Sequence, residues 1–232
     1  MLMKLIDFHA HILPRLDHGT RSSQVSMNQL RMMQNAGVDT VCATSHFYPQ
    51  ESLVERYLEA RAASFERLLE VCGDMARPKI VLGAEVLICE GLDRMEGLEK
   101  LCLEGTDILL LEMPFSANAW NDRLYRTVAD IAERGLTPVF AHVDRYPKRL
   151  VEPLFGMGFT AQLNAESLSG FFRSKHLLQW IDDGVITALG SDLHGDQMEA
   201  YQPYMKVCVN LKERAERIMA DTNDLLVEAV RR

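Results

Sequence analysis

The sequence lacks several features that mark common protein classes. Its 232 residues include only five cysteines, an odd number scattered along the chain without a Cys-x-x-Cys pair. This distribution argues against a secreted disulfide scaffold and favours a reducing, cytoplasmic compartment. We also expect no Cys-x5-Arg phosphate-binding loop, and therefore no mechanism that passes through a cysteinyl phosphate.

Basic residues are outnumbered by acidic ones, and no long apolar run is present. Lysine and arginine total 25 against 33 aspartates and glutamates, which gives a formal net charge of −8. Proteins that bind duplex nucleic acid neutralise its phosphates with basic groups, so no nucleic-acid partner is expected. No apolar stretch reaches about 18 residues, so we expect no membrane insertion. Linkers rich in proline or glycine are also absent, which predicts a single domain over residues 1–232.

What the chain does contain is a repeated alternation of short apolar strands and amphipathic helices. Strands are expected from apolar clusters, and helices from apolar positions three and four residues apart that end at glycines. The expected strands cover residues 5–8, 40–44, 80–84, 108–111, 139–141, 160–163 and 186–189. The expected helices cover residues 22–36, 54–72, 121–134, 153–157 and 175–183, and the tail from residue 198. This alternation predicts parallel βαβ units in a barrel or an open sheet.

Nearly every expected strand is followed by a side chain that can bind a metal ion. In parallel α/β folds the carboxyl ends of the strands converge on the active site. His9 and His11 follow the first strand two residues apart, so both imidazoles point to the same face of an extended segment. Asp192 and His194 repeat this spacing after the last strand. The other strand ends carry His46, Glu85, Glu112, His142 and Asn164.

Together these side chains predict a metal centre. Imidazole and carboxylate ligands without thiolates suit manganese, iron, zinc or cobalt. Asp17, in the loop after the first strand, is either another ligand or the N-cap of a turn. The ligand candidates are too many for one ion, so two or three divalent or trivalent ions fit better, and manganese is favoured. The expected ligands are His9, His11, Asp17, His46, Glu85, Glu112, His142, Asp192 and His194.

Three further residues, His18, Asp144 and Arg145, are candidates for catalytic roles. His18, in the loop after the first strand, is either a solvent-facing residue or an active-site group. Arg145 follows His142 by three residues. Its guanidinium would either bind a phosphate through two N–H groups or form a surface salt bridge. Asp144 and His18 are the candidates for a general acid, whereas His176, inside an expected helix, is interpreted as non-functional.

Seven short motifs occur in one fixed order along the chain. They are Asp7-Phe8-His9-Ala10-His11-Ile12-Leu13-Pro14 with Asp17-His18-Gly19, Ala43-Thr44-Ser45-His46, Gly83-Ala84-Glu85, Glu112-Met113-Pro114-Phe115, His142-Val143-Asp144-Arg145-Tyr146, Gln162-Leu163-Asn164-Ala165-Glu166-Ser167-Leu168-Ser169-Gly170 and Ser191-Asp192-Leu193-His194. Together they resemble the PHP (polymerase and histidinol phosphatase) superfamily over about residues 5 to 195. The resemblance is greatest to its bacterial protein-tyrosine phosphatase branch, which regulates capsule and exopolysaccharide synthesis. Glu112 resembles that branch, because many other members have a histidine at this position.

This resemblance implies a distorted (β/α)7 TIM-like barrel, with a three-metal cluster at the C-terminal ends of the strands. The implied ligand sets are His9, His11, Glu85 and Asp192 for the first ion, Glu85, Glu112 and His142 for the second, and Asp17, His46 and His194 for the third. The sequence departs from the family at His18, where an aspartate is usual, and in the residues Val143 and Asp144. It also lacks the arginine that usually follows the final metal-binding histidine. Because all the ligand positions are kept, we expect a loaded cluster.

The implied activity is that of a metal-dependent phosphotyrosine-protein phosphatase. Its implied partner is an autophosphorylated tyrosine kinase of capsule or exopolysaccharide synthesis in the cytoplasm. Two alternatives stay open, a histidinol-phosphate phosphatase and a metal-binding regulatory protein of low activity. The metal identity, the physiological substrate and the oligomeric state also stay open.

Overall fold

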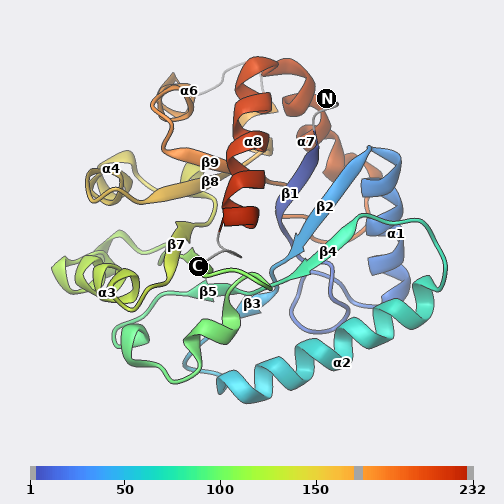
Figure 1. Cartoon of the computed structure of the whole chain (residues 1–232), viewed down its shortest axis with the longest axis horizontal. Coiled ribbons are helices and arrows are strands. Elements are labelled where there is room, and N and C mark those ends of the chain that lie inside the picture. The colour runs from blue at the N-terminus through green and yellow to red at the C-terminus, as the bar shows by residue number, and fades with distance from the viewer. Residues whose placement is uncertain (1–3, 170–174, 229–232) are drawn as a thin grey trace.

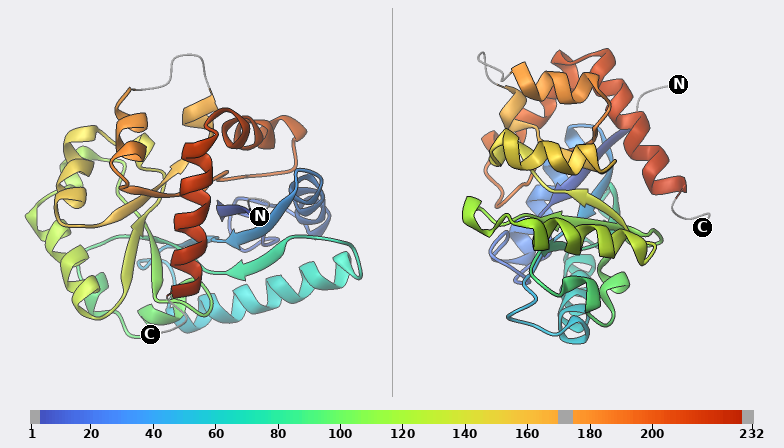
Figure 2. Two further views of the ribbon diagram at one scale, coloured as in Figure 1. Left: turned by 45° about the horizontal axis from the view of Figure 1, so that its top comes forward. Right: turned by 90° about the vertical axis from the view of Figure 1, so that its left-hand side faces the viewer.

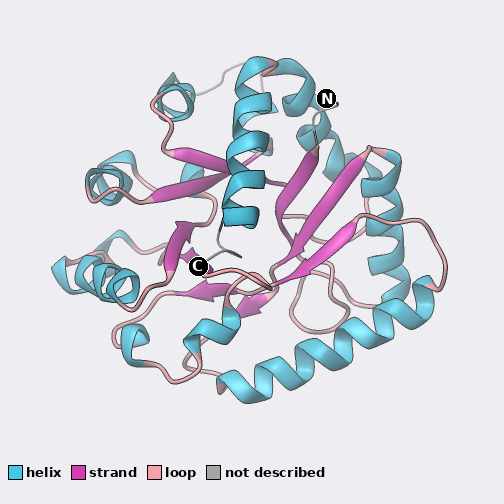
Figure 3. Ribbon diagram, viewed as in Figure 1, coloured by secondary structure: helices cyan, strands magenta, loops and turns pink. Residues whose placement is uncertain are grey.

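The computed structural model describes residues 4–169 and 175–228, and its centre consists of two parallel β-sheets (Figures 1 and 3). The smaller sheet has the strand order β1-β2-β4, and the larger has the order β3-β5-β6-β7-β8-β9. Every strand pair within them is parallel. The strands are β1 (Leu5–Ala10), β2 (Val38–Ala43), β3 (His46–Phe47), β4 (Lys79–Leu82), β5 (Glu85–Leu87), β6 (Ile108–Glu112), β7 (Thr137–Phe140), β8 (Thr160–Asn164) and β9 (Ile186–Gly190).

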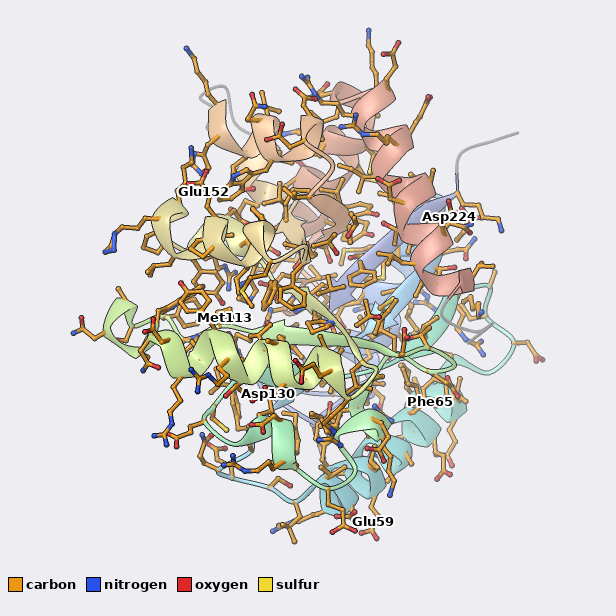
Figure 4. The ribbon with its side chains drawn as sticks, turned by 60° about the vertical axis from the view of Figure 1, so that its left-hand side comes forward. Glu59, Phe65, Met113, Asp130, Glu152 and Asp224 are labelled. Carbon is orange, nitrogen blue, oxygen red and sulfur yellow. The ribbon has the colours of Figure 1, made fainter. Side chains whose placement is uncertain are left out.

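Helices lie around the periphery of the sheets (Figures 1 and 2). Their outward faces carry charged side chains, such as those of Glu59, Glu152 and Asp224, whereas Met113 is buried between the layers (Figure 4). No helix in residues 4–169 or 175–228 is both long and apolar enough to cross a bilayer. The α-helices are α1 (Ser23–Asn35), α2 (Val54–Cys72), α3 (Asp122–Glu133), α4 (Lys148–Gly156), α5 (Glu166–Ser169), α6 (Lys175–Asp182), α7 (Met198–Asn210) and α8 (Glu213–Glu228).

Local sequence explains where several helices start and stop. The Ser22 hydroxyl accepts a hydrogen bond from the Val25 N–H, and the Asn121 side chain accepts from the first turn of α3. Such short polar side chains satisfy N–H groups that have no partner within the helix. Gly37 and Gly135, just after α1 and α3, have φ angles of 79° and 87°, which only glycine adopts at little cost.

Two of the expected strands are bent, so each appears as a pair of short strands. Two residues separate β2 from β3, and two separate β4 from β5. Across the first bend, the Thr44 N–H bonds to the Ala10 carbonyl and the Glu85 N–H bonds to the Ser45 carbonyl. Hydrogen bonding between neighbouring strands therefore continues through the bends. As a result His46 and Glu85 begin new strands, whereas the sequence placed them just after strands.

Within the described residues the structure confirms the expected α/β fold with parallel sheets, but not a closed barrel. Strands β1 and β9 meet only near their carboxyl ends, where Asp192 N–H bonds to the His9 carbonyl and His11 N–H bonds to the Leu193 carbonyl. Helix α8 packs against both strands, and it lies across the gap between them in Figure 1. The Tyr204 hydroxyl of α7 bonds to the carbonyl of Ile6, which satisfies an acceptor that a neighbouring strand would otherwise take.

Candidate metal centre

The nine expected ligands lie close together at the carboxyl ends of the strands. Glu85 contacts four histidines: its carboxylate oxygens lie 2.8 Å from a ring nitrogen of His142, 2.9 Å from His46, 3.3 Å from His9 and 3.4 Å from His11. The remaining ligands extend this cluster on its two sides. Asp17 and Asp192 contact His11, Glu112 lies 3.7 Å from His46 and from His142, and His194 lies 3.5 Å from Asp192.

Three histidines form a hydrogen bond through Nδ1, which leaves their Nε2 atoms without a hydrogen. The Nδ1 atom of His9 lies 3.1 Å from the amide oxygen of Gln162, and that of His11 lies 2.7 Å from an Asp17 carboxylate oxygen. The Nδ1 atom of His194 lies 2.9 Å from the Asp192 carbonyl. Each partner is an acceptor, so each Nδ1 carries the hydrogen and each Nε2 presents a lone pair. Metal-binding histidines are commonly held in this way.

The lone pairs of two of these rings face each other. The Nε2 atoms of His9 and His11 are 3.1 Å apart, and both rings are fully buried. Two facing lone pairs repel unless a cation or a proton lies between them. Burial lowers the pKa of His11, but its contacts with Asp17, Asp192 and Glu85 raise it well above the ordinary value. In the metal-free chain a proton therefore offsets the repulsion that an ion would remove.

Several buried polar atoms at the centre have no hydrogen-bond partner within the described residues. They are Nδ1 of His46, Oε2 of Glu85, Nδ1 of His142 and Nε2 of His194. The first two lie 2.9 Å apart but lack hydrogen-bond geometry. Burial lowers the pKa of His194 to about 4, so that its ring is neutral at physiological pH. Unpaired imidazole and carboxylate donors fit divalent transition ions.

The arrangement of donors differs in detail from the ligand sets that the resemblance implies. The donors form three groups whose atoms lie within 4.8 Å of one another: His9, His11 and Asp192; His11, His46 and His194; and His46, Glu85 and Glu112. Asp17 belongs to none of these groups. One of its carboxylate oxygens accepts from His11 and from the His46 backbone N–H, and the other accepts from Gly19. His142 contacts the third group through Glu85.

Gln162 orients the ring of His9 and holds the backbone of His142, a role that the reasoning from sequence missed. Its amide oxygen accepts from His9 Nδ1 and, at 2.7 Å, from the backbone N–H of His142. Its amide nitrogen donates to the side chain of Asn164, whose own nitrogen donates to Asp192. A chain of three amide and carboxylate groups thus connects strand β8 to expected ligands on three other segments. Its position two residues before Asn164, on the same strand face, is the sequence signal that could have identified it.

Asp7 is a second buried residue that positions the centre. One carboxylate oxygen accepts from the Ser191 N–H at 2.8 Å, and the other accepts from the Tyr201 hydroxyl at 3.0 Å. Burial raises the pKa of Asp7 to about 6. These bonds tie β1 to the segment after β9, and therefore hold His9 near Asp192.

The three catalytic candidates occupy different positions around the centre. Arg145 is 44% exposed, and its guanidinium lies 2.8 Å from an Asp192 oxygen. Asp144 accepts from the backbone N–H of Asn164, and burial raises the pKa of its carboxyl group. His18 is exposed, and its ring stacks on those of His46 and His194 at 4.8 Å between centroids.

The Cys-x5-Arg spacing does occur in the chain, at Cys208 and Arg214. The structure shows that it forms no phosphate-binding loop, since the chain passes there from α7 to α8. Cys208 is 6% exposed, and burial raises the pKa of its thiol to about 12. Arg214 donates two hydrogen bonds to Asp182.

A family model described as "Capsular polysaccharide synthesis, CpsB/CapC" matches residues 5–228. The chain belongs to the CpsB/CapC family. Tyrosine-protein phosphatase CpsB of Streptococcus pneumoniae is 28% identical over 222 residues, which cover 87% of both chains. Tyrosine-protein phosphatase YwqE of Bacillus subtilis (strain 168) is 28% identical over 205 residues, which cover 82% of this chain and 77% of YwqE. The resemblance inferred from the motifs is therefore confirmed.

Solved structures share the fold of this CpsB/CapC chain. A crystal structure described as YwqE from B. subtilis and CpsB from S. pneumoniae, unique metal-dependent tyrosine phosphatases, matches with a TM-score of 0.78 and 23% identity. The match covers 98% of this chain and 94% of that one. Histidinol phosphate phosphatase of Lactococcus lactis matches with a TM-score of 0.59 and 12% identity, over 91% and 94% of the two chains. At these identities the likeness establishes the fold.

Proposed function

We propose that this protein is a metal-dependent phosphomonoesterase that hydrolyses phosphotyrosine in proteins. The observation that carries the proposal is the pair of facing Nε2 atoms of His9 and His11, surrounded by the carboxylates of Glu85 and Asp192. Its relatives named tyrosine-protein phosphatase support the choice of substrate. We further propose a distorted seven-stranded barrel as the architecture, an autophosphorylated tyrosine kinase as the partner, and the cytoplasm as the location.

The proposed ligands are the nine residues expected from the sequence, holding two or three ions with manganese favoured. When bound, such ions neutralise charge on phosphoryl oxygens and make water acidic enough to react near neutral pH. The protein's part is to orient the donors. Gln162 fixes His9, Asp17 fixes His11, and the Asp192 carbonyl fixes His194.

Arg145 is the residue we propose to bind the phosphate from the side of the solvent. One of its guanidinium nitrogens contacts Asp192, and the half-exposed side chain has further N–H groups to offer. Arginine binds phosphate through two parallel hydrogen bonds when geometry allows. The same guanidinium charge also offsets part of the negative charge of Asp192.

The leaving group decides which ester this centre can cleave. One oxygen of Asp144 is engaged by Asn164, and His18 stacks on the imidazoles of two ligand residues, so neither is placed as a free general acid. A phenol has a pKa near 10 and needs less protonation on leaving than an aliphatic alcohol. We therefore expect phosphotyrosine and other aryl esters to be preferred over phosphoserine and histidinol phosphate.

The test compares kcat/KM for a phosphotyrosine peptide, a phosphoserine peptide and histidinol phosphate with manganese-loaded protein. Elemental analysis should give two to three ions per chain, and EDTA should abolish activity. Glu85→Gln, which alters the carboxylate that contacts four histidines, should lower the metal content. A tenfold preference for histidinol phosphate would replace the assignment with a histidinol-phosphate phosphatase. Full activity of the metal-free protein would refute the metal-dependent mechanism.

A further inference from the structure

A pocket of about 350 Å³ opens beside the metal centre. On one side it is lined by Asp17, His18 and His46, which are residues of the centre itself. On the other side it is lined by the segment after β3 and by the first two turns of α2. A volume of this size falls within the range of sites for small ligands. Whatever occupies the pocket therefore contacts residues of the centre itself.

Aromatic rings form the walls of the pocket. The Tyr48 ring stacks on His46 with 5.2 Å between centroids and an interplanar angle of 18°, and the His18 ring stacks on His46 at 16°. Tyr57 and Phe47 also line the pocket. Their rings pack edge to face, and the Tyr57 hydroxyl donates a hydrogen bond of 2.7 Å to the Ser45 carbonyl. Rings held in this way offer contact area with little loss of side-chain entropy on binding.

The charged residues at the rim do not favour an ion of either sign. Apart from Asp17, which belongs to the centre, the charged residues that line the pocket are Glu51 and Arg56, one of each sign. Within the described residues, Arg56 forms no ion pair. The aromatic walls, rather than net charge, therefore distinguish this pocket. Aromatic surfaces next to a phosphate site match a ligand that carries its phosphate on an aryl ring.

We propose that this pocket receives the aryl ring of the phosphotyrosyl ester, with His18 and Tyr48 as its walls, while the phosphate lies at the metal centre. The inference rests on the proposed function and assigns its specificity to named residues. It also assigns His18 to contact with the substrate ring. At this position the PHP family usually has an aspartate.

A second aromatic residue near the centre provides the competing arrangement. Phe115 is 62% exposed, and its ring stacks on His142 at 6.0 Å and 12°. It does not line the pocket. If the substrate ring instead lay on this surface, replacement of Phe115 would remove the preference for aryl ligands, and changes in the pocket would not.

The experiment measures binding of phenylphosphonate and methylphosphonate to the manganese-loaded protein by calorimetry. Both ligands carry the same phosphonate, so their affinity ratio isolates the contribution of the ring. Ala60→Leu narrows the pocket from an exposed position on α2, where leucine is a good helix former. The matched control is Ala62→Leu, which lies on the same helix, is exposed and does not line the pocket. Tyr48→Ala removes one wall, and Phe115→Ala tests the competing surface.

Ala60→Leu and Tyr48→Ala should each weaken phenylphosphonate about tenfold, the size expected for losing one aromatic contact and its buried area. Methylphosphonate affinity and metal content should stay within twofold of the wild type, as they should for Ala62→Leu. The inference is overturned if Ala60→Leu leaves the ratio unchanged, if both ligands weaken equally, or if only Phe115→Ala abolishes the ratio. If the wild type binds no phosphonate and cleaves no phosphomonoester, the proposed function itself fails.

Discussion

Replacing Gln162 by methionine should destabilise the metal-free protein and weaken metal binding. The change keeps a long side chain of similar volume but removes the amide. It leaves two buried donors, the His9 Nδ1–H and the His142 backbone N–H, without an acceptor. A buried donor that loses its partner costs about 1–3 kcal/mol, so the two together cost about 2–6 kcal/mol. For a chain of this length, 2 kcal/mol lowers the melting temperature by roughly 4–8 °C.

The effect on metal affinity follows from the same hydrogen bonds. Without Gln162, His9 is free to exchange tautomers and to rotate, so its Nε2 no longer faces the centre in every molecule. Loss of such a supporting partner typically weakens metal binding by about 10–100-fold. Calorimetric melting of the metal-free protein and manganese titration against a chromophoric chelator measure the two effects separately.

Gln29→Met is the matched control for this experiment. Gln29 is also fully buried, but it makes one hydrogen bond, at 3.3 Å to the His11 carbonyl, and its amide oxygen has no partner within the described residues. The Gln29→Met substitution should therefore change manganese affinity by less than threefold. The reasoning is refuted if Gln162→Met keeps both the melting temperature and the affinity of the wild type, or if the two variants behave alike.

Three further changes test other parts of the centre. Arg145→Lys should lower kcat/KM for a phosphotyrosine peptide by about tenfold or more, since lysine cannot form two parallel bonds to phosphate; wild-type kinetics would assign Arg145 to a surface salt bridge. Gly190→Ala should lower stability and metal affinity, because the added Cβ would lie 2.6 Å from the Cβ of His9. Gly156→Ala, at the end of helix α4 with no neighbour within 4 Å, should lower neither. Cys208→Ser should keep metal-loaded activity, because the thiol, with its pKa raised to about 12 by burial, is not a nucleophile at neutral pH; loss of activity at unchanged melting temperature would contradict this.

The parts of the site that could be predicted are those that depend on short-range periodicity. The spacing of His9 and His11 predicts both rings on one face of an extended segment, and in the structure their Nε2 atoms lie 3.1 Å apart. The helix from Val54 to Cys72 has the bounds that the apolar spacing predicted. Strand ends were also informative, because parallel strands in one sheet deliver their carboxyl ends to the same edge.

What could not be predicted depends on contacts between distant segments. Gln162 looks like any polar residue in a strand until His9 and His142 are placed against it. At the bend between β4 and β5, a Cβ on Gly83 would lie 2.5 Å from Leu103, a contact between distant segments that no local pattern predicts. The position of α8 beside β1 and β9 likewise follows from tertiary packing that no local pattern records.

The backbone at the metal centre indicates that its geometry is imposed by the rest of the fold. His142 and Asp192 have φ angles of 33° and 51°, in the left-handed region that residues other than glycine rarely adopt. Such conformations cost about 1–3 kcal/mol each and persist only where surrounding contacts enforce them. Here the Gln162 oxygen holds the His142 N–H, while the His9 carbonyl holds the Asp192 N–H. The centre therefore combines strained backbone, facing lone pairs and buried carboxylates, each unfavourable in the metal-free chain. Because a bound ion would relieve the electrostatic part of that cost, metal affinity and folding stability should be linked at this site.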